Sequence, residues 1–417
     1  MGAAAAMRAT VLMQTMRAAL CVMLCASALS CGGGKGSGFS SGGSGDPPPP
    51  ASNVASVIVD AGPTKNNVNT LYTSVTVCVP GSTTNCQTID HIEVDTASFG
   101  LRILAPVLTL TLPVQKASDG NSLVECTVFA DGYSWGPVVK ADLQVGGEAA
   151  SSVPIQVIGD SRFATVPANC SDSGPTEEDT VATFGANGIL GIGVFAQDCG
   201  PACVTSADAQ FYYSCSSTVC QPTMVPLASQ VPNPISMFAT DNNGSIIDLP
   251  SVASQGALTV TGSLIFGVDT QSNNASGAQT VLTVDPDFGI LTANFNGQPL
   301  SQSFIDSGSN GIYFDDTNLT VCTATGLTDF YCPASVQNLT VTLQGADGVT
   351  ANVNFSVGNA QTLSTDNPTF TALPTLAGTT PVADSFDFGL PFFYGRRVAT
   401  VLESQTTSAG TGPYIAY

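Results

Sequence analysis

The stretch "HIEVDTASFGLRIL", residues 91–104, runs as an apolar, strand-like segment into Asp95 and then turns through three small residues. Asp is disfavoured inside strands, and an Asp-Thr-Ala-Ser corner offers side-chain oxygens to its own backbone, which is typical of a tight turn. A closely related stretch, "FIDSGSNGIYF", returns at residues 304–314. This repeat decides the fold that we expect, because it places the same Asp-containing turn in each half of the chain.

The two stretches align around their aspartates. Asp95 corresponds to Asp306, and the three following positions pair as Thr96 with Ser307, Ala97 with Gly308, and Ser98 with Ser309. The aspartates are about one domain's length apart in the chain. Two similar lobes, each offering one Asp on a tight loop, would bring the carboxyl groups face to face across a pseudo-two-fold axis.

Paired carboxyl groups have a specific chemistry. Two carboxyls in contact do not both ionise readily, so they share a proton and their titrations split. The ionised partner then takes a proton from a water molecule, while the protonated partner donates to a carbonyl oxygen. We expect Asp95 and Asp306 to be the catalytic residues and the hydroxyls of Thr96 and Ser307 to brace the two loops. The small residues at 97 and 308 would let backbone amides approach the carboxylates.

The composition agrees with strands rather than helices. Of the 417 residues, 43% are hydrophobic and only 10% are charged, and Val, Thr, Ser, Gly and Pro are abundant. These residues favour strands and turns, so the predicted fold class is all-β or nearly so. The formal net charge of −21 argues against nucleic acid as a partner, because such a surface repels phosphate.

Other hydrolase chemistries find little support. The chain has one histidine, His91, which excludes HExxH zinc proteases and multi-histidine metal sites. The string "GYSWG", residues 132–136, matches the nucleophile motif of serine hydrolases, but that motif requires a helix after the serine, and residues 138–145 read as a strand. We expect His91 to face solvent or a surface partner. No metal and no cofactor is predicted.

The N-terminus predicts export. Residues 1–30 read as a signal peptide that resembles a bacterial lipoprotein signal, with Cys31 as the lipidated residue and residues 31–55 as a Gly/Ser/Pro tether. Gly32 after this cysteine points to the outer membrane. The expected location is therefore the cell envelope, with the membrane contacted through the lipid alone. The alternative is an ordinary secretory signal cut near Ser30, which would give a soluble secreted or periplasmic protein.

The cysteines after the tether number ten, and an even count in an exported chain predicts up to five disulfides. Cys78 with Cys86 and Cys322 with Cys332 are close enough in sequence to be local pairs. The pairing of the remaining six is left open; zinc is the rival for the four clustered ones, but their spacing lacks a paired C-x-x-C pattern. These six are Cys126, Cys170, Cys199, Cys203, Cys215 and Cys220.

Taken in order, several segments resemble the pepsin-like aspartic proteases from about residue 68 to the C-terminus. Besides the two Asp motifs, they are "ADLQVGG" after the flap, "GANGILGIG" at 185–193, "TGSLIFGVD" at 261–269 and "FDFGLPFFYGRRVATVLE" at 386–403. The chain also resembles a group of bacterial lipoproteins classed as a domain of unknown function. Residues 185–193 resemble the segment that threads beneath the first catalytic loop in pepsin-like proteins, and residues 386–403 resemble the closing glycine segment of the second lobe and the strand after it.

The resemblance implies a bilobal, mostly β protein with a pseudo-two-fold relation between lobes at residues 56–247 and 248–417. It also implies an aspartic endopeptidase that functions as a monomer and binds a peptide or protein substrate in the cleft between the lobes.

Three departures from the family bear on activity. Ala97 stands where the family has Gly, which would cost about 1–2 kcal/mol if that position needed a left-handed backbone or close approach. Phe129 is nearest by spacing to the flap tyrosine, with Tyr133 and Trp135 as neighbouring candidates for which hairpin packing is favoured. Asp387 places a charge where an apolar residue is expected. The alternative function is a catalytically silent binding module; the presence of both aspartates and both hydroxyl partners favours the peptidase.

Overall fold

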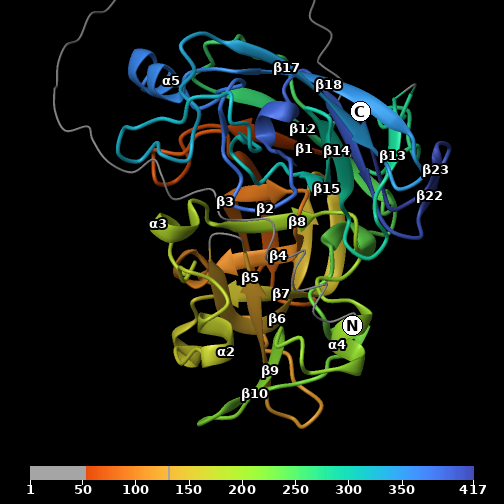
Figure 1. The fold of residues 1–417 in the computed structure, drawn as a ribbon. Coiled ribbons are helices and arrows are strands. Elements are labelled where there is room, and N and C mark those ends of the chain that lie inside the picture. Colours follow the sequence, from red (N-terminus) through yellow and green to blue (C-terminus); the bar gives the residue numbers. More distant parts are fainter. Residues whose placement is uncertain (1–52, 130–131, 278) are drawn as a thin grey trace, which may run out of the picture.

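The structure is a computed structural model that describes residues 53–129, 132–277 and 279–417. The signal segment, Cys31 and most of the tether lie outside the described residues. The chain folds mostly into strands arranged in two lobes, which confirms the predicted fold class (Figure 1). The strands of the first half are β1 (Val54–Val59), β2 (Leu71–Cys78), β3 (Cys86–Asp95), β4 (Phe99–Leu104), β5 (Ser122–Val128), β6 (Tyr133–Val145), β7 (Glu148–Ile158), β8 (Gly188–Ile192), β9 (Tyr212–Cys215), β10 (Cys220–Pro222) and β11 (Gly244–Asp248).

The second half continues in the same way, and its helices are few and short. Its strands are β12 (Val260–Phe266), β13 (Val281–Thr283), β14 (Leu291–Phe295), β15 (Gln298–Ile305), β16 (Ile312–Tyr313), β17 (Gln337–Gln344), β18 (Thr350–Val357), β19 (Ala377–Gly378), β20 (Asp387–Phe388), β21 (Arg397–Val401), β22 (Thr406–Thr407), β23 (Gly410–Thr411) and β24 (Tyr414–Ala416). The α-helices of the chain are α2 (Ala168–Ser171), α3 (Val181–Phe184), α4 (Pro201–Thr205) and α5 (Ala360–Asp366). Single 3-10 turns are η1 (Ala105–Val107), η2 (Ser161–Phe163), η3 (Leu227–Ser229), η4 (Pro234–Met237) and η5 (Leu390–Phe392).

Two large sheets carry these strands. The larger has the order β10-β9-β5-β6-β7-β4-β8-β3-β2-β1-β12-β11-β21-β24-β13, and the smaller has the order β18-β17-β14-β15-β20-β16-β19. Strand β1 pairs antiparallel with β12 over six residues, so the N-terminal strand lies beside a strand of the second half. The larger sheet therefore extends from one lobe into the other (Figure 1).

The expected lobe boundary between residues 247 and 248 falls inside β11. This strand pairs with β12 on one side and with β21 on the other, in the part of the larger sheet that both halves share. The division of the chain into two lobes at this point stays a prediction.

Local sequence explains the longest hairpin. Strands β6 and β7 are joined by Gly146 and Gly147, and Val145 pairs directly with Glu148. Both glycines have positive φ, 55° and 84°, which is the backbone that a two-residue hairpin turn of matching twist requires. The Gly-Gly pair thus sets the register of this hairpin.

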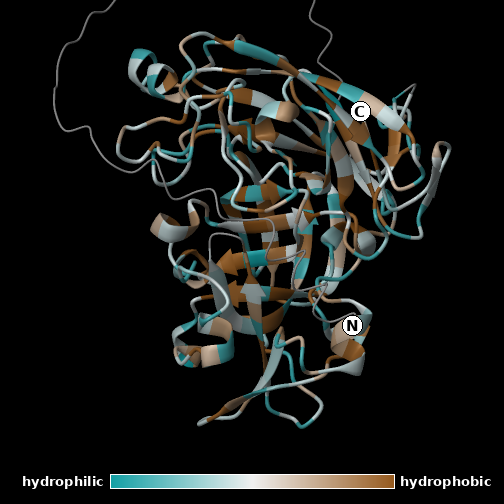
Figure 2. Ribbon diagram, viewed as in Figure 1, coloured by the Kyte–Doolittle hydropathy of each residue, from teal (hydrophilic) through white to brown (hydrophobic). Residues whose placement is uncertain are grey.

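The core is apolar and continuous through both lobes, and Figure 2 shows apolar residues concentrated on the strands inside them. In the second lobe, aromatic rings stack on one another behind the second Asp loop. Phe386 is stacked on Phe314 at 4.7 Å and on Phe388 at 4.4 Å between ring centroids. Aromatic pairs of this kind add about 0.5–1.5 kcal/mol beyond the area they bury, so they hold the strands under the loop firmly in place.

All ten described cysteines are paired. Cys78–Cys86 and Cys322–Cys332 form the local bridges that were expected. The pairs left open by the sequence are Cys126–Cys170, Cys199–Cys203 and Cys215–Cys220. Zinc is thereby excluded from the four-cysteine cluster. Five disulfides indicate an extracytoplasmic protein that matures in an oxidising compartment.

Within the described part of the chain, none of the helices has the length and apolar character needed to cross a membrane.

Candidate active site

The first Asp loop rests on a strand threaded beneath it. Strand β3 ends at Asp95 and β4 begins at Phe99, and β8 lies between them, parallel to β3 and antiparallel to β4. The predicted threading of residues 185–193 is therefore confirmed. Gly191 lies directly under the loop, where an added Cβ would lie 2.5 Å from the nitrogen of Phe99. No side chain fits there, which is why the apolar run contains a glycine at this point.

The second Asp loop has the same construction. Strand β20 pairs parallel with β15, which ends just before Asp306, and antiparallel with β16, which follows the loop. Gly389 comes immediately after β20, and a Cβ there would lie 2.1 Å from the carbonyl oxygen of Gly311. The two halves of the site are thus built by the same local rule.

Reciprocal hydrogen bonds tie the loops together. Ser307 Oγ accepts from the nitrogen of Thr96 at 3.1 Å and donates to the carbonyl of Val94 at 2.7 Å. Thr96 Oγ1 accepts from the nitrogen of Ser307 at 3.0 Å and donates to the carbonyl of Ile305 at 3.2 Å. Both hydroxyls are buried, so each loop holds the backbone of the other.

Asp95 and Asp306 are brought together by this bracing. An added Cβ at Gly308 would lie 3.0 Å from Oδ1 of Asp95 and 3.1 Å from Oδ1 of Asp306, so both carboxyl groups border this one residue. They are 3% and 2% exposed, respectively, so both are removed from bulk water. Burial raises the pKa of Asp306 well above its usual value, and the charges of Asp95 and Asp387 and a hydrogen bond with Asp95 raise it further. The pair has the environment in which two carboxyls share a proton.

Backbone amides reach both carboxyls through the small residues that follow them. The nitrogen of Ala97 donates to Asp95 Oδ1 and the nitrogen of Gly308 donates to Asp306 Oδ1, each at 2.7 Å. Neither residue has a positive φ, so a left-handed backbone is not the reason for a glycine here. Close approach is the reason at Gly308, where a Cβ would lie 2.9 Å from the carboxyl carbon of Asp95.

The two serines that follow behave differently. Ser309 Oγ lies 2.9 Å from Asp306 Oδ2 and 2.6 Å from Asp387 Oδ2. The hydroxyl of Ser98, at the corresponding place in the first loop, is buried and has no hydrogen-bond partner among the described residues. The site is therefore symmetric in its backbone and asymmetric in its polar side chains.

The flap candidates separate in the structure. Phe129 follows directly after β5 and packs edge-on against Phe184, with ring centroids 5.8 Å apart. Trp135 lies inside the hairpin, where its Nε1 donates to the carbonyl of Phe163 at 2.8 Å and its ring meets Tyr213. Tyr133 is also buried and lies beside Glu177, which forms a bridge with its backbone. Trp135 and Tyr133 thus serve hairpin packing, and the flap role of Phe129 stays a prediction.

A serine-histidine pair is not formed. Ser134 of the "GYSWG" string lies in strand β6, and its hydroxyl donates to Gln156 Oε1 at 3.1 Å. His91 lies against Asp60 and Asp90, 3.2 Å and 3.3 Å away, with its side chain 27% exposed. Among the described residues, no group of three or more His, Cys, Asp or Glu side chains is placed to hold a metal ion.

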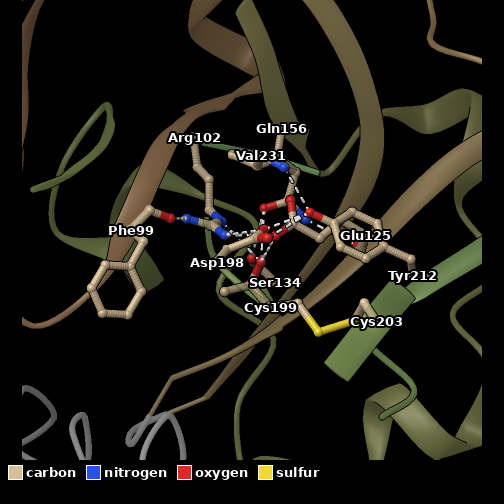
Figure 3. A network of polar contacts seen from close by, with 11 residues as sticks. Phe99, Arg102, Glu125, Ser134, Gln156, Asp198, Cys199, Cys203, Tyr212 and Val231 are labelled. Atoms are coloured by element: carbon tan, nitrogen blue, oxygen red, sulfur yellow. Dashed lines mark hydrogen bonds and ion pairs between the residues drawn. A yellow bond between two sulfur atoms is a disulfide. The ribbon is translucent and has the colours of Figure 1, made fainter. Parts of the chain in front are cut away.

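A second buried cluster, shown in Figure 3, centres on the strand that follows the first loop. Arg102 of β4 forms ion pairs with Glu125 at 2.6 Å and with Asp198 at 3.2 Å, and Tyr212 donates to Asp198 at 2.6 Å. One guanidinium here faces two carboxyls. Burial raises the pKa of Asp198 well above its usual value, and the charge of Glu125 raises it further, whereas Arg102 lowers it.

Neither the contact of Ser309 with Asp387 nor the Arg102 cluster follows from the sequence alone. Asp387 is a charge at a position where an apolar residue is expected, and its contact with Ser309 joins residues 78 positions apart. Arg102 and Glu125 stand inside otherwise apolar strands, "FGLRIL" and "SLVECTV", and that isolated charge in an apolar strand is the signal that could have found them.

Two lobes of strands, each with one Asp loop lying on a threaded glycine and tied to the other by reciprocal hydrogen bonds, define the class: a bilobal, pepsin-like aspartic protease fold. Among solved structures, the chain is similar to an aspartic proteinase from Irpex lacteus, with 14% sequence identity and a TM-score of 0.48. The similarity covers 87% of this chain and 96% of that one. No curated protein matches the chain.

The chain belongs to the family described as "Protein of unknown function (DUF3443)", whose model matches residues 49–417. The predicted membership in a domain of unknown function is thereby confirmed. The catalytic roles of Asp95 and Asp306, and the supporting roles of their neighbours, stay predictions.

Proposed function

We propose that the protein is an aspartic endopeptidase in which Asp95 and Asp306 activate water for the hydrolysis of peptide bonds. The observation that carries this proposal is the placement of both buried carboxyls against one residue, Gly308, with a backbone amide donating to each. Buried carboxyls that share a proton are suited to act together as base and acid.

In the proposed reaction, one carboxyl of the pair accepts a proton while the other donates one. The ionised carboxyl takes a proton from water, and the hydroxyl oxygen bonds to the carbon of the peptide carbonyl. The protonated carboxyl donates to the carbonyl oxygen, which gives a neutral tetrahedral intermediate. The intermediate then breaks its C–N bond. The leaving nitrogen receives the proton that the first carboxyl took from water, and one hydroxyl of the intermediate returns its proton to the second carboxyl, which gives a carboxylic acid and an amine and restores the pair. The substrate is a peptide or protein bound between the lobes, and the protein acts as a monomer.

The direct test incubates the mature domain with a denatured protein from acidic to neutral pH, with and without a pepstatin-like inhibitor. We expect cleavage in acid that the inhibitor blocks. Asp95→Asn and Asp306→Asn should each reduce turnover by at least a thousandfold while the thermal unfolding midpoint stays close to that of the wild type, because Asn keeps the shape but cannot be the ionised base. Cleavage that survives either substitution would refute the proposal.

The second candidate is a catalytically silent binding protein with the same fold. The observation that favours it is the side chain at Ala97, since the matching position in the second loop, Gly308, has no room for one. A binder would cleave nothing at any pH, and its affinity for a ligand would be unaffected by Asn at position 95 or 306.

We also propose that Cys31 is lipidated and anchors the protein to the outer membrane. The oxidising location indicated by five disulfides supports export. Labelled palmitate should enter the wild type, and Cys31→Ser should move the protein to the soluble fraction. Unchanged membrane association of that variant would leave the anchor without support.

A further inference from the structure

A third buried carboxyl, Asp387, belongs to the site. It is the first residue of β20, the strand threaded beneath the second Asp loop, and it is 3% exposed. Its Oδ2 lies 2.6 Å from Ser309 Oγ, which in turn lies 2.9 Å from Asp306 Oδ2. The three carboxyls thus form one series, in which Asp95 meets Asp306 directly and Ser309 joins Asp306 to Asp387.

The hydrogen count at Ser309 constrains the protons of this series. A serine hydroxyl has one hydrogen and can donate to one carboxyl at a time. If Asp306 and Asp387 were both ionised, one of the two short contacts would hold only lone pairs facing each other. One of these carboxyls must therefore carry a hydrogen and donate it to Ser309 Oγ.

The surroundings of the two carboxyls decide which one carries that hydrogen. Asp306 already accepts from the nitrogen of Gly308 on Oδ1, so it is equipped with donors on both oxygens once Ser309 turns to it. Asp387 Oδ1 is buried and has no partner among the described residues. An ionised carboxylate with an unpaired buried oxygen is far more costly than a neutral acid in the same place.

We propose that Asp387 is a positioning residue that stays protonated, donates to Ser309 Oγ, and thereby directs the only proton of Ser309 to Asp306. The neutral form also keeps a third negative charge away from the catalytic pair. The asymmetry of the site is consistent with this role, because the hydroxyl of Ser98 in the first loop makes no such contact.

The charged groups around Asp387 act in the same direction. Burial raises the pKa of Asp387 well above its usual value; the hydrogen bond with Ser309 lowers it, and the charge of Asp95 raises it again. Asp306 faces it across Ser309. On the paired strands, Phe304 lies opposite on β15 and Tyr313 lies opposite on β16, with its hydroxyl bonded to Asn310. No cation is among these neighbours in the described structure.

The first test counts the proton without using activity. A carboxyl that is protonated when folded and ionised when unfolded makes the unfolding equilibrium constant rise with pH, by up to about tenfold per pH unit. We expect urea unfolding of Asp387→Asn to show this rise reduced by close to one proton above pH 5. The same reduction should appear when Asp387→Asn is added to Asp306→Asn, where Asp306 cannot hold the proton. Equal slopes in either background would overturn the proposal.

The second test rests on the proposed function and uses the pH profile of hydrolysis. The amide of Asp387→Asn can donate to Ser309 as the neutral acid does, so the midpoint of the acidic limb of the profile should stay within about 0.3 pH unit of the wild-type midpoint. A limb that moves to lower pH would mean that Asp387 is ionised, which contradicts the proposal. If neither the wild type nor any variant cleaves at any pH, the proposed function fails. The unfolding test still determines whether Asp387 is protonated in the folded protein.

Two further variants complete the design. Ser309→Ala removes the hydroxyl that joins the carboxyls, so Asp306 loses a hydrogen-bond donor and the acidic limb of the pH profile should move to higher pH. An unmoved limb would contradict the proposed role of Ser309 as a donor to Asp306.

Asp198→Asn is the matched control, because Asp198 is a buried acid of raised pKa in the separate Arg102 cluster (Figure 3). It should reduce the pH dependence of unfolding and leave the profile of hydrolysis unchanged; a shifted profile would show that the assay does not isolate Asp387.

Discussion

Position 97 carries a methyl group where the second loop has only a hydrogen atom. The nitrogen of Ala97 still reaches Asp95 Oδ1 at 2.7 Å, the same distance as in the Gly308 contact with Asp306. The carboxyl of Asp95 therefore keeps its backbone donor. The methyl group can change the space around the carboxyl groups of Asp95 and Asp306. This space matters because catalysis depends on preorganised geometry at the sub-ångström level.

The residue-scale prediction concerns this methyl group. Ala97→Gly should raise the rate of hydrolysis several-fold, or create activity if the wild type has none, because it restores the space that the second loop has at Gly308. Gly308→Ala is the opposite control and should abolish activity, since its Cβ would lie 2.9 Å from the carboxyl carbon of Asp95. Initial rates on a quenched peptide at acidic pH measure both. If neither the wild type nor Ala97→Gly cleaves the peptide at any pH, the proposed peptidase function is refuted, and only the assignment of the fold stands.

At the scale of single elements, the two threaded strands explain what the sequence could predict. The family resemblance of residues 185–193 predicted the threading of β8, and residues 386–403, which resemble the closing glycine segment of the second lobe, contain β20 in the corresponding place. The sequence also offered the hydroxyls of Thr96 and Ser307 as candidates for bracing the loops, because they follow the aspartates directly. The contact of Ser309 with Asp387 and the Arg102 cluster could not be predicted, since both depend on side chains brought together from distant strands by the packing of a whole lobe.

Gly389 provides the prediction at this scale. Gly389→Ala should lower the free energy of unfolding by about 3 kcal/mol or more, because its Cβ would lie 2.1 Å from a backbone oxygen that cannot move without displacing the Asp306 loop. The matched control is Gly81→Ala in the hairpin closed by Cys78–Cys86, where an added Cβ meets nothing within 4 Å and only its positive φ of 78° is unfavourable. That variant should lose about 1–2 kcal/mol. Urea unfolding compares the two, and equal losses would refute the steric explanation.

For the whole molecule, buried acids determine how stability depends on pH. Burial raises the pKa of Asp198, Asp306 and Asp387, and burial together with Asp241 raises the pKa of Glu148 to about 6. Each of these groups binds a proton more tightly when folded than when unfolded. Each one therefore makes the protein less stable as pH rises above about 4, the unfolded pKa, toward its own folded pKa.

The expected result is a stability maximum in acid. Hydrogen bonds lower the pKa values of Asp160 and Asp269 despite partial burial, so their contribution is lost only below about pH 4. The free energy of unfolding should therefore peak near pH 4–5 and fall toward pH 7, by up to about 1.4 kcal/mol per pH unit for each extra proton held. Thermal or urea unfolding from pH 3 to pH 8 measures this. A maximum at neutral pH would show that these acids are ionised in the folded protein.

The position of β1 has a consequence for detachment from a surface. The chain enters the fold through β1, which is held by six pairs with β12 of the second half, whereas its link to β2 runs through the exposed residues Lys65 and Asn66. If Cys31 carries the proposed lipid anchor, a cut at that link would leave β1 paired in the sheet, so the cut protein would stay attached to the membrane until it is denatured. With a specific cleavage site inserted after Lys65, we expect the cut protein to sediment with membranes in buffer and to be shed in urea. Release from the membrane in buffer alone would mean that β1 is held too weakly in the sheet to keep the cut protein attached.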